Sequence, residues 1–300
     1  MFSVIKTKKI WFSLSAALFA LSIAAVVTWG FKLGIDFTGG ALIEVHMTGT
    51  RPDSSVVTTA VASATKEQPH VQPLGDKAFI IRTKFIDEPT HQQILTQLKK
   101  MSNIGELREE RFETIGPTVS SELQRRAVWS IFMVLGAIVL YVAWAFRQVS
   151  HPLPSWKFGI VAVVALLHDI IIPAGVFAVL GRFAGYEVDT LFVTAMLTIL
   201  GFSVHDTIVT FDRVREHLRL TPKLDFAQLV DQSVSETIGR SINTSMTVLL
   251  VLLAVYFFGG ESVKQFNLVL ILGVIFGTYS SIFIACPLLV VWNRLAPPAK

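Results

Sequence analysis

Residues 190–211 read TLFVTAMLTILGFSVHDTIVTF, and this stretch decides the class of the protein. An α-helix needs about 20 apolar residues to cross the hydrocarbon core of a bilayer, and this stretch is long enough. It nevertheless contains a carboxylate, Asp206. An ionised side chain at that depth costs roughly 2.5–3.5 kcal/mol on insertion scales, so it usually has a partner and a task. The stretch therefore predicts a membrane helix whose acid handles ions or protons.

Further apolar segments satisfy the same length criterion elsewhere in the chain. They are residues 10–29, 127–146, 158–180, 241–258 and 266–292. The composition agrees, because 52% of the 300 residues are hydrophobic, only 16% are charged and the mean hydropathy is +0.58. A soluble globular domain carries more charge. We expect an all-α polytopic membrane protein with six transmembrane helices and one small exported α+β domain.

The net charge of +4 does not indicate nucleic-acid binding, because the basic residues cluster beside alternate connections. These residues are Lys6, Lys8, Lys9, Arg147, Lys157, Arg213, Arg215, Arg219, Lys223 and Arg294. By the positive-inside rule such connections face the cytoplasm. We therefore expect both termini to be cytoplasmic and residues 31–126 to lie on the far side of the membrane.

The expected organisation has three parts. Residues 1–30 form a cytoplasmic tail and the first helix, and residues 31–126 form the exported domain. Residues 127–300 form a five-helix domain with a cytoplasmic loop at about 212–240, in which 226–234 is an amphipathic surface stretch. The first apolar stretch is longer than a signal-peptide core, which favours a retained anchor over a cleaved signal. The single cysteine, Cys286, excludes an intrachain disulfide.

The exported segment alternates between strand and helix patterns. We expect strands at 41–47, 71–74, 78–83 and 106–115, and helices at 54–67 and 89–101, the first of them capped by Asp53. Gly75-Asp76 is a hairpin turn signal between the second and third strands. The order β-α-β-β-α-β is that of a ferredoxin-like domain.

A glycine-rich sequence, GIDFTGG at residues 34–40, joins the first helix to this domain. Gly34, Asp36, Gly39 and Gly40 are its candidate functional residues. Glycine adopts positive φ angles, so the sequence predicts a tight turn from membrane to strand, which we favour over a ligand site. It is not a phosphate-binding loop, because no Gly-Lys-Ser/Thr follows.

Arg240 precedes the fifth apolar segment and is the candidate partner of Asp206. From the helical rise, Asp206 lies roughly 24 Å and Arg240 roughly 27 Å from the outer ends of their helices. Ser203 and Thr210 share the helix face of Asp206, and Thr244 and Thr247 share that of Arg240. Such hydroxyl groups are suited to holding the file of water that a proton path needs.

His168-Asp169 and His205-Asp206 repeat one dipeptide in two helices. Adjacent residues point about 100° apart on a helix, so each His is expected to bond to another helix rather than share the partner of its Asp. Histidine titrates nearest neutral pH, which keeps a proton role open beside a packing role. In the sixth segment, Gly273 and Gly277 form a GxxxG pattern for close helix packing, and Pro287 predicts a kink.

Simpler interpretations stay open. Asp206 and Arg240 form either a proton site or only a structural ion pair. Arg240 alternatively pairs with Glu236 or snorkels to the surface, and Asp206 is alternatively hydrated from the cytoplasm. No metal-ligand cluster, nucleophile motif or nucleotide loop is present in the sequence, so we expect neither an enzyme nor a cofactor.

Four motifs together resemble the SecF family of bacterial protein-export membrane subunits. They begin at Gly34 (GIDFTGG), Thr114 (TIGPTVS), Gly201 (GFSVHDTIVTFDRVRE) and Ser241 (SINTS). The resemblance implies the fold of half an RND-type transporter in the bacterial inner membrane. It implies SecD, the SecYEG channel and YajC as partners, and unfolded exported polypeptides and protons as substrates. Asp206 and Arg240 fall on positions assigned to proton transport, with Asp169 as an accompanying acid.

His205 departs from the family pattern, in which Asn commonly precedes the aspartate. His205 and His168, with Ser203 and Thr244, are therefore candidates for tuning or extending the relay. The resulting hypothesis is a proton-driven subunit of the Sec protein translocase that assists late export and whose periplasmic domain is residues 31–126. A small-molecule RND-type exporter and a non-energetic scaffold of the translocon are the alternatives.

Overall fold

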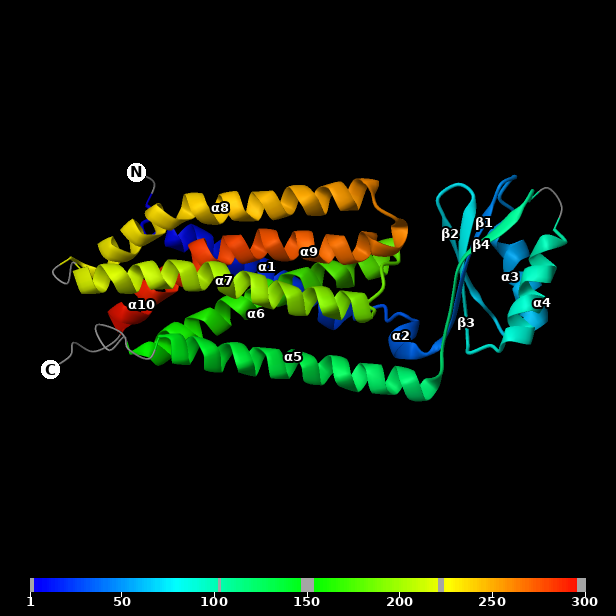
Figure 1. Ribbon diagram of the computed structural model, residues 1–300, viewed down its shortest axis with the longest axis horizontal. Coiled ribbons are helices and arrows are strands. Elements are labelled where there is room, and N and C mark those ends of the chain that lie inside the picture. Colours follow the sequence, from blue (N-terminus) through cyan, green and yellow to red (C-terminus); the bar gives the residue numbers. More distant parts are fainter. Residues whose placement is uncertain (1–2, 102–103, 147–153, 221–223, 296–300) are drawn as a thin grey trace. The chain divides into compact units, whose positions relative to one another are not determined.

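The computed structural model describes residues 3–101, 104–146, 154–220 and 224–295. The chain divides into two compact units, drawn in Figure 1. One is helical and comprises Met1–Lys32 with Val128–Lys300, and the other is Leu33–Ala127.

The described residues contain the six helices that the hydropathy predicts, all in the helical unit except the first turns of α5. Each is long and apolar enough to cross a membrane, which confirms the predicted polytopic class. The helices are α1 (Lys8–Trp29), α5 (Pro117–Ala145), α6 (Ser155–Ala184), α7 (Thr190–Leu220) and α8 (Phe226–Phe258), followed by α9 (Glu261–Ser280), a π-helix (Ser281–Ala285) and α10 (Cys286–Leu295), which together make the sixth span.

The expected connection at residues 212–240 is mostly helical, because α7 continues to Leu220 and α8 already begins at Phe226. The stretch 226–234 is therefore not a separate surface helix, which corrects that expectation. Val230 and Val234 are fully buried, since they pack into the interior of the bundle rather than against a membrane surface. Arg147 and Lys223, two of the basic residues used for orientation, lie outside the described residues.

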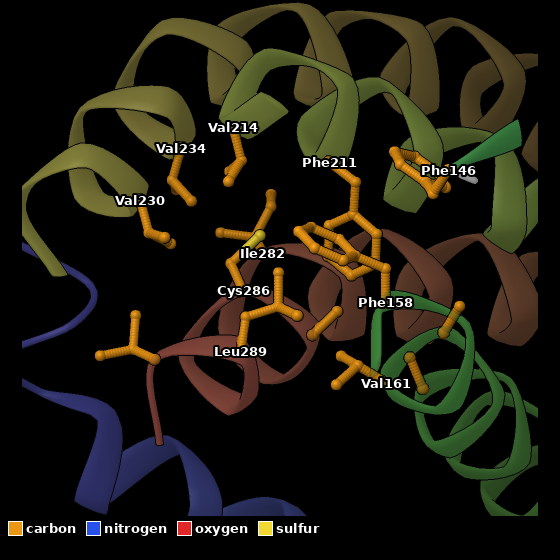
Figure 2. Close-up of a cluster of buried hydrophobic side chains, with 14 of the residues drawn as sticks. Phe146, Phe158, Val161, Phe211, Val214, Val230, Val234, Ile282, Cys286 and Leu289 are labelled. Atoms are coloured by element: carbon orange, nitrogen blue, oxygen red, sulfur yellow. The ribbon is translucent and has the colours of Figure 1, made fainter. Parts of the chain in front are cut away.

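A hydrophobic cluster joins the helices at one end of the helical unit (Figure 2). Phe211 of α7 meets the ring of Phe158 of α6 edge-on, with 5.4 Å between ring centroids. Val214 and Val234 point into the same cluster from α7 and α8, opposite Ile282 and Cys286. The residues Val4 and Ile5, just before α1, are also buried in it. The cluster therefore fixes α6, α7, α8 and the π-helix to one another.

Small residues allow α9 to approach α7 closely. A Cβ atom added to Gly273 would lie 2.0 Å from Cγ1 of Ile199, and one added to Gly277 would lie 3.0 Å from Cβ of Ser203. This confirms that the GxxxG pattern is a packing face. The same device joins α6 to α1, where a Cβ on Gly175 would lie 2.3 Å from that of Ser22.

The expected irregularity at Pro287 takes the form of a π-helix over Ser281–Ala285. Proline has no N–H to continue the regular helical bonding, so the turn before it is free to rearrange. The Cys286 thiol bonds the Ser281 carbonyl, five residues earlier, at 3.3 Å. Such π turns occur frequently at functional sites.

The second unit is a four-stranded antiparallel sheet with the order β2-β3-β1-β4, which confirms the ferredoxin-like α+β class. Its strands are β1 (Gly40–Met47), β2 (His70–Leu74), β3 (Ala78–Thr83) and β4 (Leu107–Ile115), and its helices are α2 (Ile35–Thr38), α3 (Ser54–Thr65) and α4 (Glu88–Lys99). Asp53 caps α3 as expected, by accepting a hydrogen bond from the Ser55 amide at 2.9 Å. The core of this unit includes Ile43, Phe79 and Ile94, all fully buried.

Candidate functional site

Asp169 of α6 is completely buried and fully hydrogen-bonded. Its carboxylate accepts hydrogen bonds from the Ser203 hydroxyl of α7 and from the Ser280 hydroxyl of α9, the latter at 2.7 Å. Nδ1 of His168 lies 2.9 Å from its other oxygen. A buried carboxylate is tolerated when donors replace its hydration. Asp169 therefore connects α6, α7 and α9.

Asp206 of α7 is also buried, with 4% of its surface exposed, but it is less well satisfied. Its Oδ2 atom has no hydrogen-bond partner among the described residues. The hydroxyl groups of Ser245 in α8 and Thr278 in α9 interact with the Asp206 carboxyl group and lie 2.5 Å from each other. Asp206 therefore lies beside hydroxyl groups of two neighbouring helices and retains one unpartnered oxygen among the described residues.

The expected contact between Asp206 and Arg240 is not formed. Arg240 is exposed on α8, and no ion pair within the described part of the chain joins it to Asp206 or to Glu236. Arg240 lines the same cleft as Thr237, whose hydroxyl oxygen lies 3.4 Å from that of Thr210, one helical turn from Asp206. The two residues therefore lie at similar depths, as the sequence predicts. The rotation of α8 about its axis, however, directs the Arg240 side chain away from the acid.

The remaining candidates separate into an inner and an outer group. Ser203 and His168 are buried beside Asp169, and the His168 ring stacks on Tyr279 of α9 with 6.0 Å between centroids. The His168 side chain thus reaches the carboxylate of its own neighbour, contrary to the expectation that it bonds to another helix. His205 and Thr244 lie instead on exposed faces of α7 and α8.

The glycine-rich junction is a short helix, α2, followed by two glycines with positive φ. Gly39 has φ +71° and Gly40 has φ +125°, and Gly34 precedes the helix. A Cβ atom on Gly40 would lie 2.5 Å from the Thr83 carbonyl oxygen of β3. Both the backbone conformation and the available space therefore require glycine at position 40. Asp36 lies in the first turn of α2.

Thr278 and Ser280 border the acids but were not among the residues predicted to form the site. The sequence signal was present, since TYSS at residues 278–281 is the polar run inside an otherwise apolar segment. Among the described residues there is no cluster of three or more His, Cys, Asp or Glu that could hold a metal ion. The arrangement can exchange protons or hold helices together, and both roles suit hydroxyl groups and carboxylates.

Six span-length helices that bury two carboxylates, with a small antiparallel sheet as a second unit, define a polytopic membrane protein of the transport class. The family model "Protein export membrane protein SecD/SecF, C-terminal" matches residues 93–295, and "SecD/SecF GG Motif" matches residues 25–50. The chain belongs to the SecD/SecF family.

Its similarity to individual relatives extends over nearly the whole chain. It is 38% identical to "Protein translocase subunit SecF" of Thermobaculum terrenum, with 98% of this chain and 95% of the relative covered. It is 35% identical to the protein of the same name of Haemophilus influenzae, with 93% and 82% covered. "Protein translocase subunit SecDF" of Thermus thermophilus is 35% identical, and 92% of this chain matches 36% of that longer protein.

A solved structure has the same fold. The crystal structure of SecDF, a translocon-associated membrane protein from Thermus thermophilus, superposes with a TM-score of 0.84 at 29% identity. The match covers 98% of this chain and 39% of that one. This chain therefore corresponds to one part of a longer polypeptide in that relative.

Proposed function

We propose that this chain is a subunit of the Sec protein translocase that associates with SecD and uses the proton gradient to assist protein export. The names of its full-length relatives support the translocase assignment. The SecDF relative supports the association with SecD. Its name joins SecD and SecF in one polypeptide, and this chain matches only 36% of it.

The observation that carries the proton role is the unpartnered oxygen of Asp206, inside a membrane-spanning helix. An ionised carboxylate is costly where water is excluded and a donor is missing. Protonation removes that charge, and the hydroxyl groups of Ser245 and Thr278 remain beside the neutral acid. Asp206 is therefore the acid at which a change of protonation would alter the packing of α7, α8 and α9 most.

Arg240 and Asp169 have different proposed roles in the relay. Arg240 is exposed within a membrane span, so its partner in the assembly is expected to be water or a polar group of SecD. Asp169 holds three helices through its donors and acts as the accompanying acid. His205, which is exposed on the same helix as Asp206, would face the same surroundings as Arg240.

We infer that the chain lies in the bacterial inner membrane with both termini in the cytoplasm. The positive-inside rule supports this orientation, because it places basic residues such as Lys6, Lys8, Lys9 and Arg213 on the cytoplasmic side. The sheet domain then lies in the periplasm, where it would contact unfolded exported polypeptides beside the SecYEG channel, with YajC as a further associate.

Protonation of Asp206 would shift helices in the membrane, and the junction at residues 34–40 would transmit the shift to the sheet domain. Each proton that crosses the membrane supplies roughly 2.3 kcal/mol per 100 mV of potential. A domain motion between two states needs about 5.5 kcal/mol to change from one nearly pure state to the other, so several protons would act together.

The experiment measures export into vesicles that contain this chain, SecD and the channel, with and without a proton gradient. Asp206→Asn keeps the shape of the side chain but cannot change its protonation, so export should lose its response to the gradient. Asp76→Asn, the same substitution in the turn of the sheet domain, should retain the response. Normal gradient-dependent export by Asp206→Asn would exclude the proposal.

A non-energetic scaffold is the second candidate, and the complete hydrogen bonding of Asp169 favours it. A scaffold predicts that Asp206→Asn exports normally, whereas substitutions at Asp169 reduce the amount of assembled complex. The same export measurement, accompanied by quantification of the complex, therefore distinguishes the two functions.

A further inference from the structure

Polar residues continue along α7 beyond Asp206 on a single face. Asp206, Thr210, Arg213 and His217 follow one another at intervals of four, three and four residues. Residues at these intervals lie above one another on a helix. From Asp206 to His217 the face extends about 16 Å at 1.5 Å per residue.

Two residues of α8 complete this face. Oγ1 of Thr210 lies 3.4 Å from Oγ1 of Thr237, and both side chains are largely buried. One turn further, the Glu236 carboxylate accepts a hydrogen bond from the Arg213 guanidinium and lies 3.2 Å from Nε2 of His217. We call these six residues (Asp206, Thr210, Arg213, His217, Glu236 and Thr237) the α7–α8 seam.

The far end of the seam opens into a cleft of about 530 Å³. Its lining is mostly charged and consists of Val209, Asp212, Arg213, Glu216, Glu236, Thr237 and Arg240. Thr237 therefore belongs to the cleft and also touches Thr210, which lies one helical turn from Asp206. A cleft of this size with so many polar partners is suited to holding water.

Apolar side chains close the other side of the same helix turns. Phe211 and Val214 of α7, and Val230 and Val234 of α8, point into the hydrophobic cluster of Figure 2. The seam therefore has an apolar cluster on one side and the charged cleft on the other. Water that enters the cleft meets Glu236 and Thr237 before it reaches the buried Asp206.

Building on the proposed proton-driven function, we propose that Glu236, with His217, is a second proton-binding site that exchanges protons with Asp206 through the Thr237 and Thr210 hydroxyl groups. In the structure the Thr210 hydroxyl group donates to the Asp206 carbonyl oxygen and the Thr237 hydroxyl group to the Ser233 carbonyl oxygen, so each must rotate to take part. Each then donates its own proton to one neighbour as it accepts another from the opposite side, so one proton moves and no hydroxyl group stays ionised. Water completes the distances from Glu236 to Thr237 and from Thr210 to the Asp206 carboxyl group.

Two donors hold the Glu236 carboxylate in place beside the cleft. Arg213 and the Gln232 amide, the latter at 3.0 Å, donate to the Glu236 carboxylate. Glu216 also pairs with Arg213 and so shares its positive charge. Asp212 and Arg240 also line the cleft. Glu236 therefore has both acidic and basic side chains near it, with or without the proton.

The test uses the chain with SecD in vesicles that contain a pH-sensitive dye, and it records proton entry driven by an imposed gradient. Thr237→Val and Glu236→Gln should each slow entry by about tenfold or more, since a positioned proton-transfer group contributes at least this much. Thr237→Ser, which keeps a hydroxyl group, should restore the rate and so exclude misfolding. Thr198→Val, an exposed threonine of α7 that bonds its own helix, should not change it.

Two results would overturn the inference, and they differ in what else they exclude. If Asp206→Asn abolishes proton entry while Thr237→Val and Glu236→Gln leave it unchanged, the seam is not the route, but the proposed function stands. If Asp206→Asn leaves proton entry unchanged, then both the seam and the proton role of Asp206 are excluded.

Discussion

The Ser203 hydroxyl of α7 donates a hydrogen bond to the Asp169 carboxylate of α6. Three residues further along the same helix, Asp206 keeps an oxygen without a partner. One helix therefore contacts a satisfied acid on one side and carries an unsatisfied acid on another. Under the proposed function, Asp169 would mainly hold the helices together and Asp206 would mainly exchange protons.

Loss of one donor should reveal the structural role of Asp169. Ser280→Ala removes the 2.7 Å hydrogen bond to its carboxylate and should lower the free energy of unfolding by about 1.5–3 kcal/mol, the value of a hydrogen bond to a charged group. Thermal unfolding of the purified chain in detergent measures the change. Ser262→Ala, at an exposed position of α9, is the control, and equal stability of the two variants would contradict the assigned role.

The contact between α9 and α7 should not tolerate a larger residue at position 273. Gly273→Ala places a methyl group about where Ile199 now lies and should cost about 1–3 kcal/mol through overpacking. Gly201→Ala on α7, where no atom lies within 4 Å of the added Cβ, should leave the unfolding temperature almost unchanged. Similar effects of the two substitutions would show that α9 does not pack as described.

The glycine at position 40 should be needed both for its backbone conformation and for space. Gly40→Ala combines a φ of +125° with a contact of 2.5 Å to the Thr83 carbonyl oxygen. Strain of this kind costs about 1–3 kcal/mol, so amide hydrogens of β1 and β3 should exchange faster. Gly75→Ala also has a positive φ, +54°, but has no atom within 4 Å, and it should have a smaller effect. If amide exchange of β1 and β3 were unchanged in Gly40→Ala, glycine would not be required at position 40.

The cap of α3 should make this helix sensitive to acid. Hydrogen bonds from the Ser55 amide and hydroxyl groups lower the pKa of the Asp53 carboxyl group below its ordinary value. The stabilisation is therefore complete above the unfolded pKa of about 3.9 and is lost as the pH falls through the lower, folded pKa.

Hydrogen exchange of the α3 amides against pH measures this effect in the full chain. Asn at a cap position accepts the same bond without titrating. Asp53→Asn should therefore make the protection of the α3 amides, relative to their intrinsic exchange rates at each pH, independent of pH in this acidic range. If the wild type and Asp53→Asn showed the same pH profile, the cap would not be the cause of the acid sensitivity.

Hydropathy and alternation were sufficient to predict the fold. The six spans and the β-α-β-β-α-β order depend on length, on apolar content and on periods of 2 and 3.6 residues, all of which the sequence contains. The extent of α7 and α8 was missed, because polar residues such as Arg213 and Glu236 look like a loop. The apolar face of these turns, which buries Val214, Val230 and Val234, is what makes helix favourable there.

The candidate site was predicted in part. Axial rise places Asp206 and Arg240 at similar depths, but it does not determine how a helix is rotated about its axis. Ser241 and Ser245 are buried, whereas Arg240 and Thr244 are exposed, because packing against α9 sets that rotation. Arg240 and Thr244 lie together on an exposed face of α8, and the direction of that face could not be derived from the sequence.

The most direct test of the central claim is the protonation state of Asp206 itself, measured while a proton gradient is applied. Infrared difference spectroscopy of the chain with SecD in vesicles detects carboxyl groups that gain or lose a proton, and subtraction of the Asp206→Asn signal isolates this residue. The proposed function predicts a carboxyl signal that appears on acidification of the periplasmic side and is absent from Asp206→Asn. An Asp206 carboxyl group that stays in one protonation state at every gradient would contradict it.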